Sequence, residues 1–192
     1  MIVVKWRFAW WCWLPALVLA SGLTSQCTPP EPNKLLFVNS FEQVDQLAPH
    51  VEYIAPGLLS REQAYSWLQS AKIDVGNRTA VLAGRTWQAL GSPRHVRVRL
   101  RAWLPNGRQA AAIVTVMAQR PNPGAEPTIL RMQQLFLDEV VRHYRTWVPT
   151  TMFMSLSSGL QPSDEIVVSV WGRNIGEHDS IYLDDVSIED AD

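Results

Sequence analysis

Short segments in which apolar and polar residues alternate recur from about residue 34 to the C-terminus. In the clearest of them, residues 95–104, apolar side chains occupy every second position from Val96 onward. Successive side chains of a strand point to opposite faces of a sheet, so this period-two pattern predicts a half-buried strand. The opposite face of that strand would carry Arg97, Arg99, Arg101 and Trp103.

The segment 95–104 ends at a Pro-Asn-Gly sequence, which is a strong turn signal, and the alternation resumes over 110–119. These two segments are predicted to pair as an antiparallel hairpin. Further strands, spaced about ten residues apart and separated by polar turns, are expected at 35–41, 69–75, 79–83, 147–156, 165–171 and 180–189. Many short strands at this spacing predict an all-β fold, an antiparallel β-sandwich.

Residues 129–145 fit two interpretations. Ile129, Met132, Leu135 and Phe136 have a spacing that would also form one stripe of a helix. One short helical segment, at 138–145, is therefore a possible addition to the sandwich, within a long connection between strands.

The N-terminus has the order of a signal peptide. Lys5 and Arg7 precede an uncharged run over 8–23, which has small residues near its end, at 20–22. That run is shorter than the roughly 20 residues of a membrane-spanning helix, although a retained membrane anchor is the alternative. Residues 1–26 are therefore predicted to be a cleaved signal peptide.

The sequence Leu-Thr-Ser-Gln-Cys at 23–27 resembles the lipobox of bacterial lipoproteins, with Gln26 in place of the usual Gly, Ala or Ser. The resemblance implies that Cys27 is lipidated and becomes the mature N-terminus. Residues 27–34 are rich in proline and are expected to form an extended tether. The predicted location is therefore the bacterial cell envelope, lipid-anchored at the outer membrane or cell surface; the alternative is a free periplasmic or secreted protein.

Composition excludes several functional classes. Hydrophobic residues make up 47% and charged residues 18% of the chain, as in folded globular proteins. Beyond residue 26 the chain has 15 basic and 18 acidic side chains, a net charge of −3 that gives no footprint for nucleic acid. The four histidines are dispersed without metal-ligand spacing, and no nucleophile elbow or P-loop is present. The sequence therefore predicts a protein that is not an enzyme.

Several motifs, in order, resemble the galactose-binding-like jelly-roll modules, a group that includes many carbohydrate-binding modules. Asn-Ser-Phe-Glu at 39–42 resembles their opening element, and 64–74 resembles a turn and strand in which Tyr65 replaces the usual His and Trp67 the usual Gly. Arg101 stands in a strand where an aromatic residue is often found. Residues 164–171 and 180–188 resemble the two closing strands of these modules, and the second segment contains Tyr-Leu-Asp-Asp-Val. The resemblance implies a jelly-roll domain over 35–192.

The resemblance also implies a structural calcium site. In these modules the first and last strands commonly lie side by side, which would bring Glu42 near Asp184 and Asp185. Calcium is bound by carboxylates together with backbone carbonyls, here those of the 66–69 turn. The alternative is that these carboxylates face solvent or cap turns without a metal.

Sugar binding requires an exposed aromatic surface with polar side chains around it. Trp103, Trp67 and Tyr65 are the candidate aromatic residues, with Arg101 beside them, and Trp87 and Trp171 are further possibilities. By the resemblance, Trp147 and Trp171 would instead pack in the core, and any one of the candidates could also serve packing alone. The arginine row could equally be a solvated face.

Two functions follow from these features. The first is a non-catalytic binding module of the cell envelope with carbohydrate as its ligand. The second is a structural or protein-interaction subunit of the envelope that binds no sugar.

Overall fold

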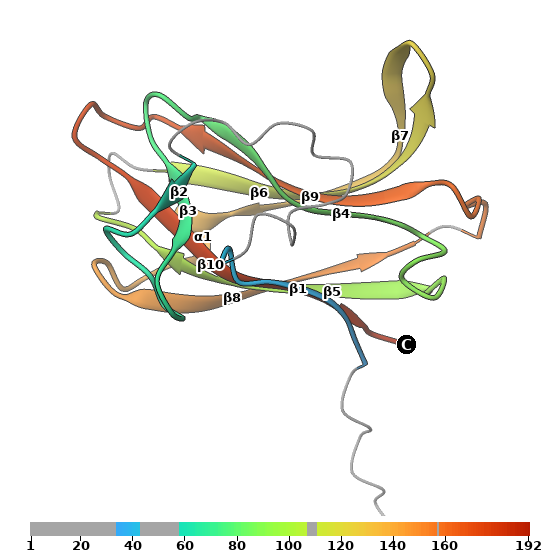
Figure 1. Cartoon of the computed structure of the whole chain (residues 1–192), viewed down its shortest axis with the longest axis horizontal. Coiled ribbons are helices and arrows are strands. Elements are labelled where there is room, and N and C mark those ends of the chain that lie inside the picture. The colour runs from blue at the N-terminus through green and yellow to red at the C-terminus, as the bar shows by residue number, and fades with distance from the viewer. Residues whose placement is uncertain (1–33, 43–57, 107–110, 157) are drawn as a thin grey trace, which may run out of the picture. The chain divides into compact units, whose positions relative to one another are not determined.

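The computed structural model describes residues 34–42, 58–106, 111–156 and 158–192. Two antiparallel sheets face each other in the compact unit Pro32–Asp192 (Figure 1), which confirms the predicted β-sandwich. The predicted signal peptide, Cys27 and all of the tether except Lys34 lie outside the described residues. Within the described ranges, no helix is long and apolar enough to cross a membrane.

The first sheet, sheet A, contains the first and the last strand of the domain. Its order is β2-β3-β10-β5-β8, and β1 also pairs with β10, beside the segment that pairs with β3. The expectation that the first and last strands lie side by side is thus confirmed. These strands are β1 (Leu35–Asn39), β2 (Leu59–Ser60), β3 (Ser70–Ile73), β5 (His95–Trp103), β8 (Trp147–Ser155) and β10 (Ile181–Asp190).

The second sheet, sheet B, has the order β4-β9-β6-β7. Its strands are β4 (Thr79–Thr86), β6 (Ala111–Asn122), β7 (Ala125–Phe136) and β9 (Glu165–Arg173). The predicted hairpin between 95–104 and 110–119 is wrong, because β5 belongs to sheet A and β6 to sheet B. The residues Ala111–Val116 are buried on both faces, as in a central strand flanked by two partners.

The hairpin that does form joins β6 to β7. Asn122 pairs with Ala125 across a two-residue turn, in which Gly124 takes a φ of +74°, a value that favours glycine. Figure 1 shows this hairpin projecting from one end of the sandwich. The segment that carries Ile129 and Met132 is therefore a strand, and the helix expected at 138–145 is one short turn, α1 (Leu137–Val140).

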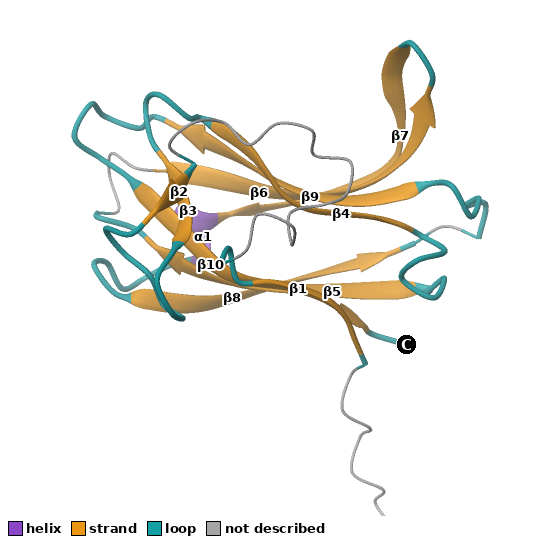
Figure 2. Cartoon of the chain, in the orientation of Figure 1, coloured by secondary structure: helices purple, strands orange, loops and turns teal. Residues whose placement is uncertain are grey.

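The core fills the space between the sheets, and Figure 2 shows α1 between the two layers. Along β5 the burial alternates as the sequence predicts: Val96, Val98, Leu100 and Ala102 are buried, and the arginines between them point outward. Leu137 of α1 is fully buried, so this single turn contributes to the core. The alternation leaves the outer face of sheet A available to carry a site.

Candidate functional site

The outer face of sheet A carries the predicted arginine row and its neighbours. The antiparallel register aligns these side chains in rows across β10, β5 and β8. The first row contains the aromatic residues Tyr182, Trp103 and Trp147. The two middle rows are centred on arginines of β5 and contain Asp184, Arg101 and Pro149, and then Ser187, Arg99 and Thr151. The last row contains Glu189, Arg97 and Phe153. Aromatic residues therefore stand at both ends of the arginine row.

At one end, Trp103 packs against Tyr182 rather than standing open to solvent. The two rings meet edge to face, 5.3 Å between centroids. The hydroxyl of Tyr182 donates a hydrogen bond to Glu62, which also bonds Lys72. Burial, and then this bond, raise the pKa of Tyr182 to about 12, whereas the bonds from Lys72 and Tyr182 lower the pKa of Glu62. Trp103 is half-buried here, so its proposed contact with a ligand stays a prediction.

Tyr65 lies beside this row and contacts two strands of the face. The guanidinium carbon of Arg101 is 4.3 Å from the centroid of the Tyr65 ring. The ring of Trp147 meets Tyr65 edge to face at 6.0 Å between centroids. Because Tyr65 is 46% exposed, part of its ring is still open to a ligand. The structure therefore brings the predicted residues Tyr65 and Arg101 into direct contact.

Trp67 occupies the position at which the resembling modules carry glycine. Its side chain is 85% exposed, and its φ is +54°, in the left-handed region that side chains rarely adopt. The backbone thus keeps the conformation that glycine would favour, although the residue is a tryptophan. A large exposed indole on a strained backbone is typical of a functional site rather than of packing.

At the other end of the face, Phe153 is 57% exposed. The guanidinium carbon of Arg97 lies 4.7 Å from its ring centroid. Glu189 is the nearest acid, with one carboxylate oxygen 3.7 Å from Arg97 and 3.4 Å from Arg99. Phe153 is not among the site residues predicted from the sequence, although its position in the alternation of 147–156 places it on the outer face.

The two predicted aspartates hold the turn that contains Tyr65. Asp184 is fully buried, and its Oδ2 accepts hydrogen bonds from the backbone N–H groups of Tyr65 (2.9 Å) and Ser66 (3.1 Å). The hydroxyl of Ser66 donates to Oδ1 of Asp185 at 2.7 Å. Burial raises the pKa of Asp184, and the backbone N–H donors oppose that shift.

Glu42 holds the same turn from the end of β1. Its Oε1 accepts the backbone N–H groups of Leu68 (2.8 Å) and Gln69 (2.9 Å). We refer to Glu42, Asp184 and Asp185, with the turn 65–69 that they bind, as the carboxylate clamp. The structure thus gathers all three predicted metal ligands around one turn.

The clamp presents backbone N–H donors to the carboxylates, whereas a calcium shell needs additional oxygen atoms such as carbonyls. Among the described residues, no three His, Cys, Asp or Glu side chains form a group able to hold a metal. The contacts satisfy Glu42 and Asp184 as turn caps, which is the alternative that the sequence left open. Calcium at this place stays a prediction.

The two tryptophans expected in the core are not in it. Trp147 lies half-buried on the outer face of sheet A, in contact with Tyr65. Trp171 is half exposed on the outer face of sheet B, where it pairs across strands with Ile113. Both occupy outward positions of their strands, because the neighbouring alternate residues, among them Val148 and Val170, pack in the core.

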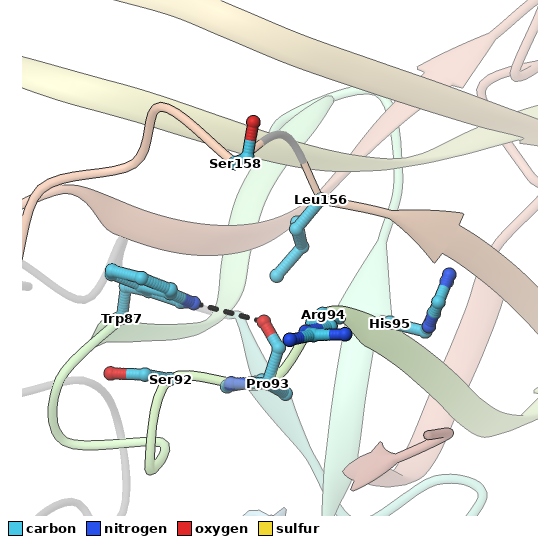
Figure 3. Close-up of a pocket in the computed structure, with 7 residues that line it drawn as sticks. All are labelled: Trp87, Ser92, Pro93, Arg94, His95, Leu156 and Ser158. Carbon is cyan, nitrogen blue, oxygen red and sulfur yellow. Dashed lines mark hydrogen bonds between the residues drawn. The ribbon is translucent and has the colours of Figure 1, made fainter.

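A separate pocket of about 550 Å³ lies among loops at one end of the sandwich (Figure 3). Trp87 forms one wall, opposite Leu156 and Ser158. The indole N–H of Trp87 donates to the carbonyl oxygen of Pro93 at 3.0 Å, so this donor is already used. The pocket is lined in addition by Ser92, Arg94 and His95. It contains Trp87, a further candidate from the sequence, but none of Trp103, Trp67, Tyr65 and Arg101.

No family model and no curated protein matches the sequence. The fold is similar to that of the C-terminal family 22 carbohydrate binding module of Clostridium thermocellum Xyn10B, with a TM-score of 0.50, 14% identity and coverage of 84% of this chain and 98% of that module. The N-terminal CBM22-1-CBM22-2 tandem domain from Paenibacillus barcinonensis Xyn10C gives a TM-score of 0.52 at 13% identity, over 86% of this chain and 51% of the tandem. At these identities the likeness shows the fold alone: the chain has the β-sandwich of carbohydrate-binding modules.

Proposed function

We propose that this protein is a non-catalytic carbohydrate-binding module and that the outer face of sheet A binds the sugar. The observation that carries the proposal is the pair of exposed rings, Tyr65 and Phe153, at the two ends of the arginine row on one sheet face. Aromatic rings offer a flat apolar surface, and the adjoining side chains supply hydrogen-bond donors that fix hydroxyl groups. The likeness of the fold to carbohydrate-binding modules is in keeping with this use.

A glycan array tests the proposal with the full chain, purified in a detergent that has no sugar headgroup. The expected result is binding to at least one polysaccharide, with binding reduced by Phe153→Ala. Trp171→Ala is the matched control, because Trp171 is a similarly exposed aromatic on the opposite sheet. Absence of binding to every glycan, or equal loss in both variants, would overturn the proposal.

The place of action is part of the same proposal. An N-terminal lipid on Cys27, followed by the proline-rich tether, would display the module at the cell envelope. The predicted signal peptide supports export, and the resemblance of residues 23–27 to a lipobox supports anchoring.

One observation favours a second candidate function, that of a protein-interaction subunit of the envelope. Trp171, Val81 and Met132 are all exposed on the outer face of sheet B. Exposed apolar side chains grouped on one sheet face are typical of interaction sites. Co-purification of an envelope protein that depends on Trp171 and not on Phe153 would favour this alternative.

A further inference from the structure

The arginine row of sheet A has more cationic groups than the acids beside it neutralise. Arg97, Arg99 and Arg101 stand at alternate positions of β5 and therefore share the outer face. From Arg97 to Arg101 the row extends for about 13 Å, at about 3.3 Å per residue. A set of three guanidinium groups at this spacing suits an extended ligand rather than a single small ion.

The acids that face this row are few. Glu189 is the carboxylate closest to Arg97 and Arg99, and both contacts are longer than a direct hydrogen bond. Asp184 pairs in register with Arg101, but its side chain is buried and accepts backbone N–H groups instead. Among the described residues, no carboxylate oxygen lies within 4.0 Å of the Arg101 guanidinium.

The donors of these arginines are unused within the described part of the chain. None of the three side chains donates a hydrogen bond there, and the buried Nε of Arg97 has no partner. The buried Oε2 of Glu189 also lacks a hydrogen bond, so Glu189 balances charge without occupying the guanidinium forks. Arginine presents planar donors that match a carboxylate in a bidentate arrangement.

The rings at the two ends hold two of the arginines in place. Arg101 lies over Tyr65, and Arg97 lies over Phe153, so both guanidinium groups are oriented before any ligand arrives. Arg99, between them, has a side chain that is 49% exposed. The face therefore combines aromatic surface at its ends with open cationic donors in the middle.

We infer that the ligand is an acidic polysaccharide whose uronic-acid carboxylates pair with this arginine row, Arg99 above all. The inference rests on the proposed carbohydrate-binding function and names the class of glycan. A neutral glycan would leave the guanidinium charges without a counterpart, whereas a uronate supplies one along with its sugar ring.

The test compares polygalacturonate with its fully methyl-esterified form, which keeps the backbone and removes the carboxylate charge. Isothermal titration of the full chain is expected to show at least about tenfold weaker binding of the ester, from the loss of charge-assisted hydrogen bonds. Arg99→Gln should weaken polygalacturonate binding about tenfold and reduce its dependence on salt. Arg131→Gln removes the same charge from an exposed position of β7 in the other sheet and should leave binding unchanged.

Each result has one meaning. Equal binding of polygalacturonate and its ester would overturn the acidic ligand while leaving the carbohydrate-binding function in place. Dextran sulfate is a sulfated polymer without uronic acids. If it binds as tightly as polygalacturonate and loses the same affinity in Arg99→Gln, the site accepts polyanions in general and the uronate assignment is overturned. Failure to bind these polymers and every neutral glycan on the array would remove the proposed function itself. The comparison between the two polymers uses the unaltered protein, so it does not depend on the folding of a variant.

Discussion

The guanidinium of Arg101 lies over the ring of Tyr65, with 4.3 Å between Cζ and the ring centroid. Arg101 belongs to strand β5, whereas Tyr65 belongs to the turn held by the carboxylate clamp. The same tyrosine ring contacts Trp147 at the start of β8. One aromatic side chain thus connects the clamp to two strands of the candidate binding face.

Removing the Tyr65 ring should loosen both the turn and the face. Tyr65→Ala is expected to lower the free energy of unfolding by about 1 kcal/mol, through loss of an exposed cation–π contact and an aromatic pair. Glycan affinity should fall as well, because Arg101 loses its support. Tyr65→Phe keeps the ring and is the control; chemical denaturation of the two variants checks the difference. Equal effects of Ala and Phe would show that the hydroxyl, rather than the ring, matters.

Trp67 offers a way to separate ligand contact from folding. Trp67→Gly should leave the melting temperature unchanged or raise it, because a left-handed φ costs about 1–2 kcal/mol for a residue with a side chain and almost nothing for glycine. If the exposed indole binds the ligand, the same variant loses glycan affinity. Thermal melting and titration of one protein sample measure both effects. A marked drop in melting temperature would mean that Trp67 stabilises the fold.

The fold class could be predicted from the sequence because a strand buried on one face has apolar residues at every second position. The outward positions of Arg97, Arg99 and Arg101 follow from that period alone. The period of two does not indicate which strands pair with each other. Strand β6 alternates well enough to pair with β5, and only its burial on both faces reveals a central strand of the other sheet.

The candidate site could likewise be predicted from the sequence only in part. The family motifs indicated that Glu42, Asp184 and Asp185 would gather, and they meet at one turn. The sequence could not indicate that backbone N–H groups, rather than carbonyls, point at Glu42 and Asp184, because that depends on the backbone of the turn. Nor could it pair Phe153 with Arg97, since this contact depends on the cross-strand register.

An ion pair between the buried Asp164 and the partly exposed Arg120 predicts how stability depends on pH. Asp164 is fully buried and accepts two hydrogen bonds of 2.8 Å from Arg120, which lower its pKa below the usual value. Its contribution to stability is therefore complete above the unfolded-state pKa of about 3.9 and is lost as the pH falls through the lower folded-state pKa.

Asp164→Asn should consequently melt at a lower temperature than the wild type at pH 7, and the difference should shrink as the pH falls below about 4. Thermal melts from pH 7 to pH 2.5 measure the gap. Glu177→Gln, at an exposed acid, is the control and should follow the wild type. A gap that stays constant with pH would show that the charge of Asp164 contributes nothing.

The proposed lipid anchor on Cys27 predicts that the protein incorporates palmitate and binds to membranes. In bacteria grown with radiolabelled palmitate, the chain should incorporate label and sediment with membranes, and Cys27→Ala should abolish both, since Cys27 is the proposed acceptor. Replacing Gln26 with Gly restores the usual lipobox residue and should not reduce labelling. A mature protein that begins after Cys27 would contradict the anchor.

The carboxylate clamp predicts how the domain responds to calcium and to chelator. If these carboxylates serve as turn caps, with oxygens of Glu42 and Asp184 already bound to backbone N–H groups, the melting temperature will be the same in EGTA and in millimolar calcium. Glu42→Ala should lower it equally in both, by leaving the N–H groups of Leu68 and Gln69 without their acceptor. Glu126→Ala, at an exposed acid of β7, is the control. A rise of melting temperature with calcium that disappears in Glu42→Ala would instead establish the metal site, with the turn rearranged to offer its carbonyls.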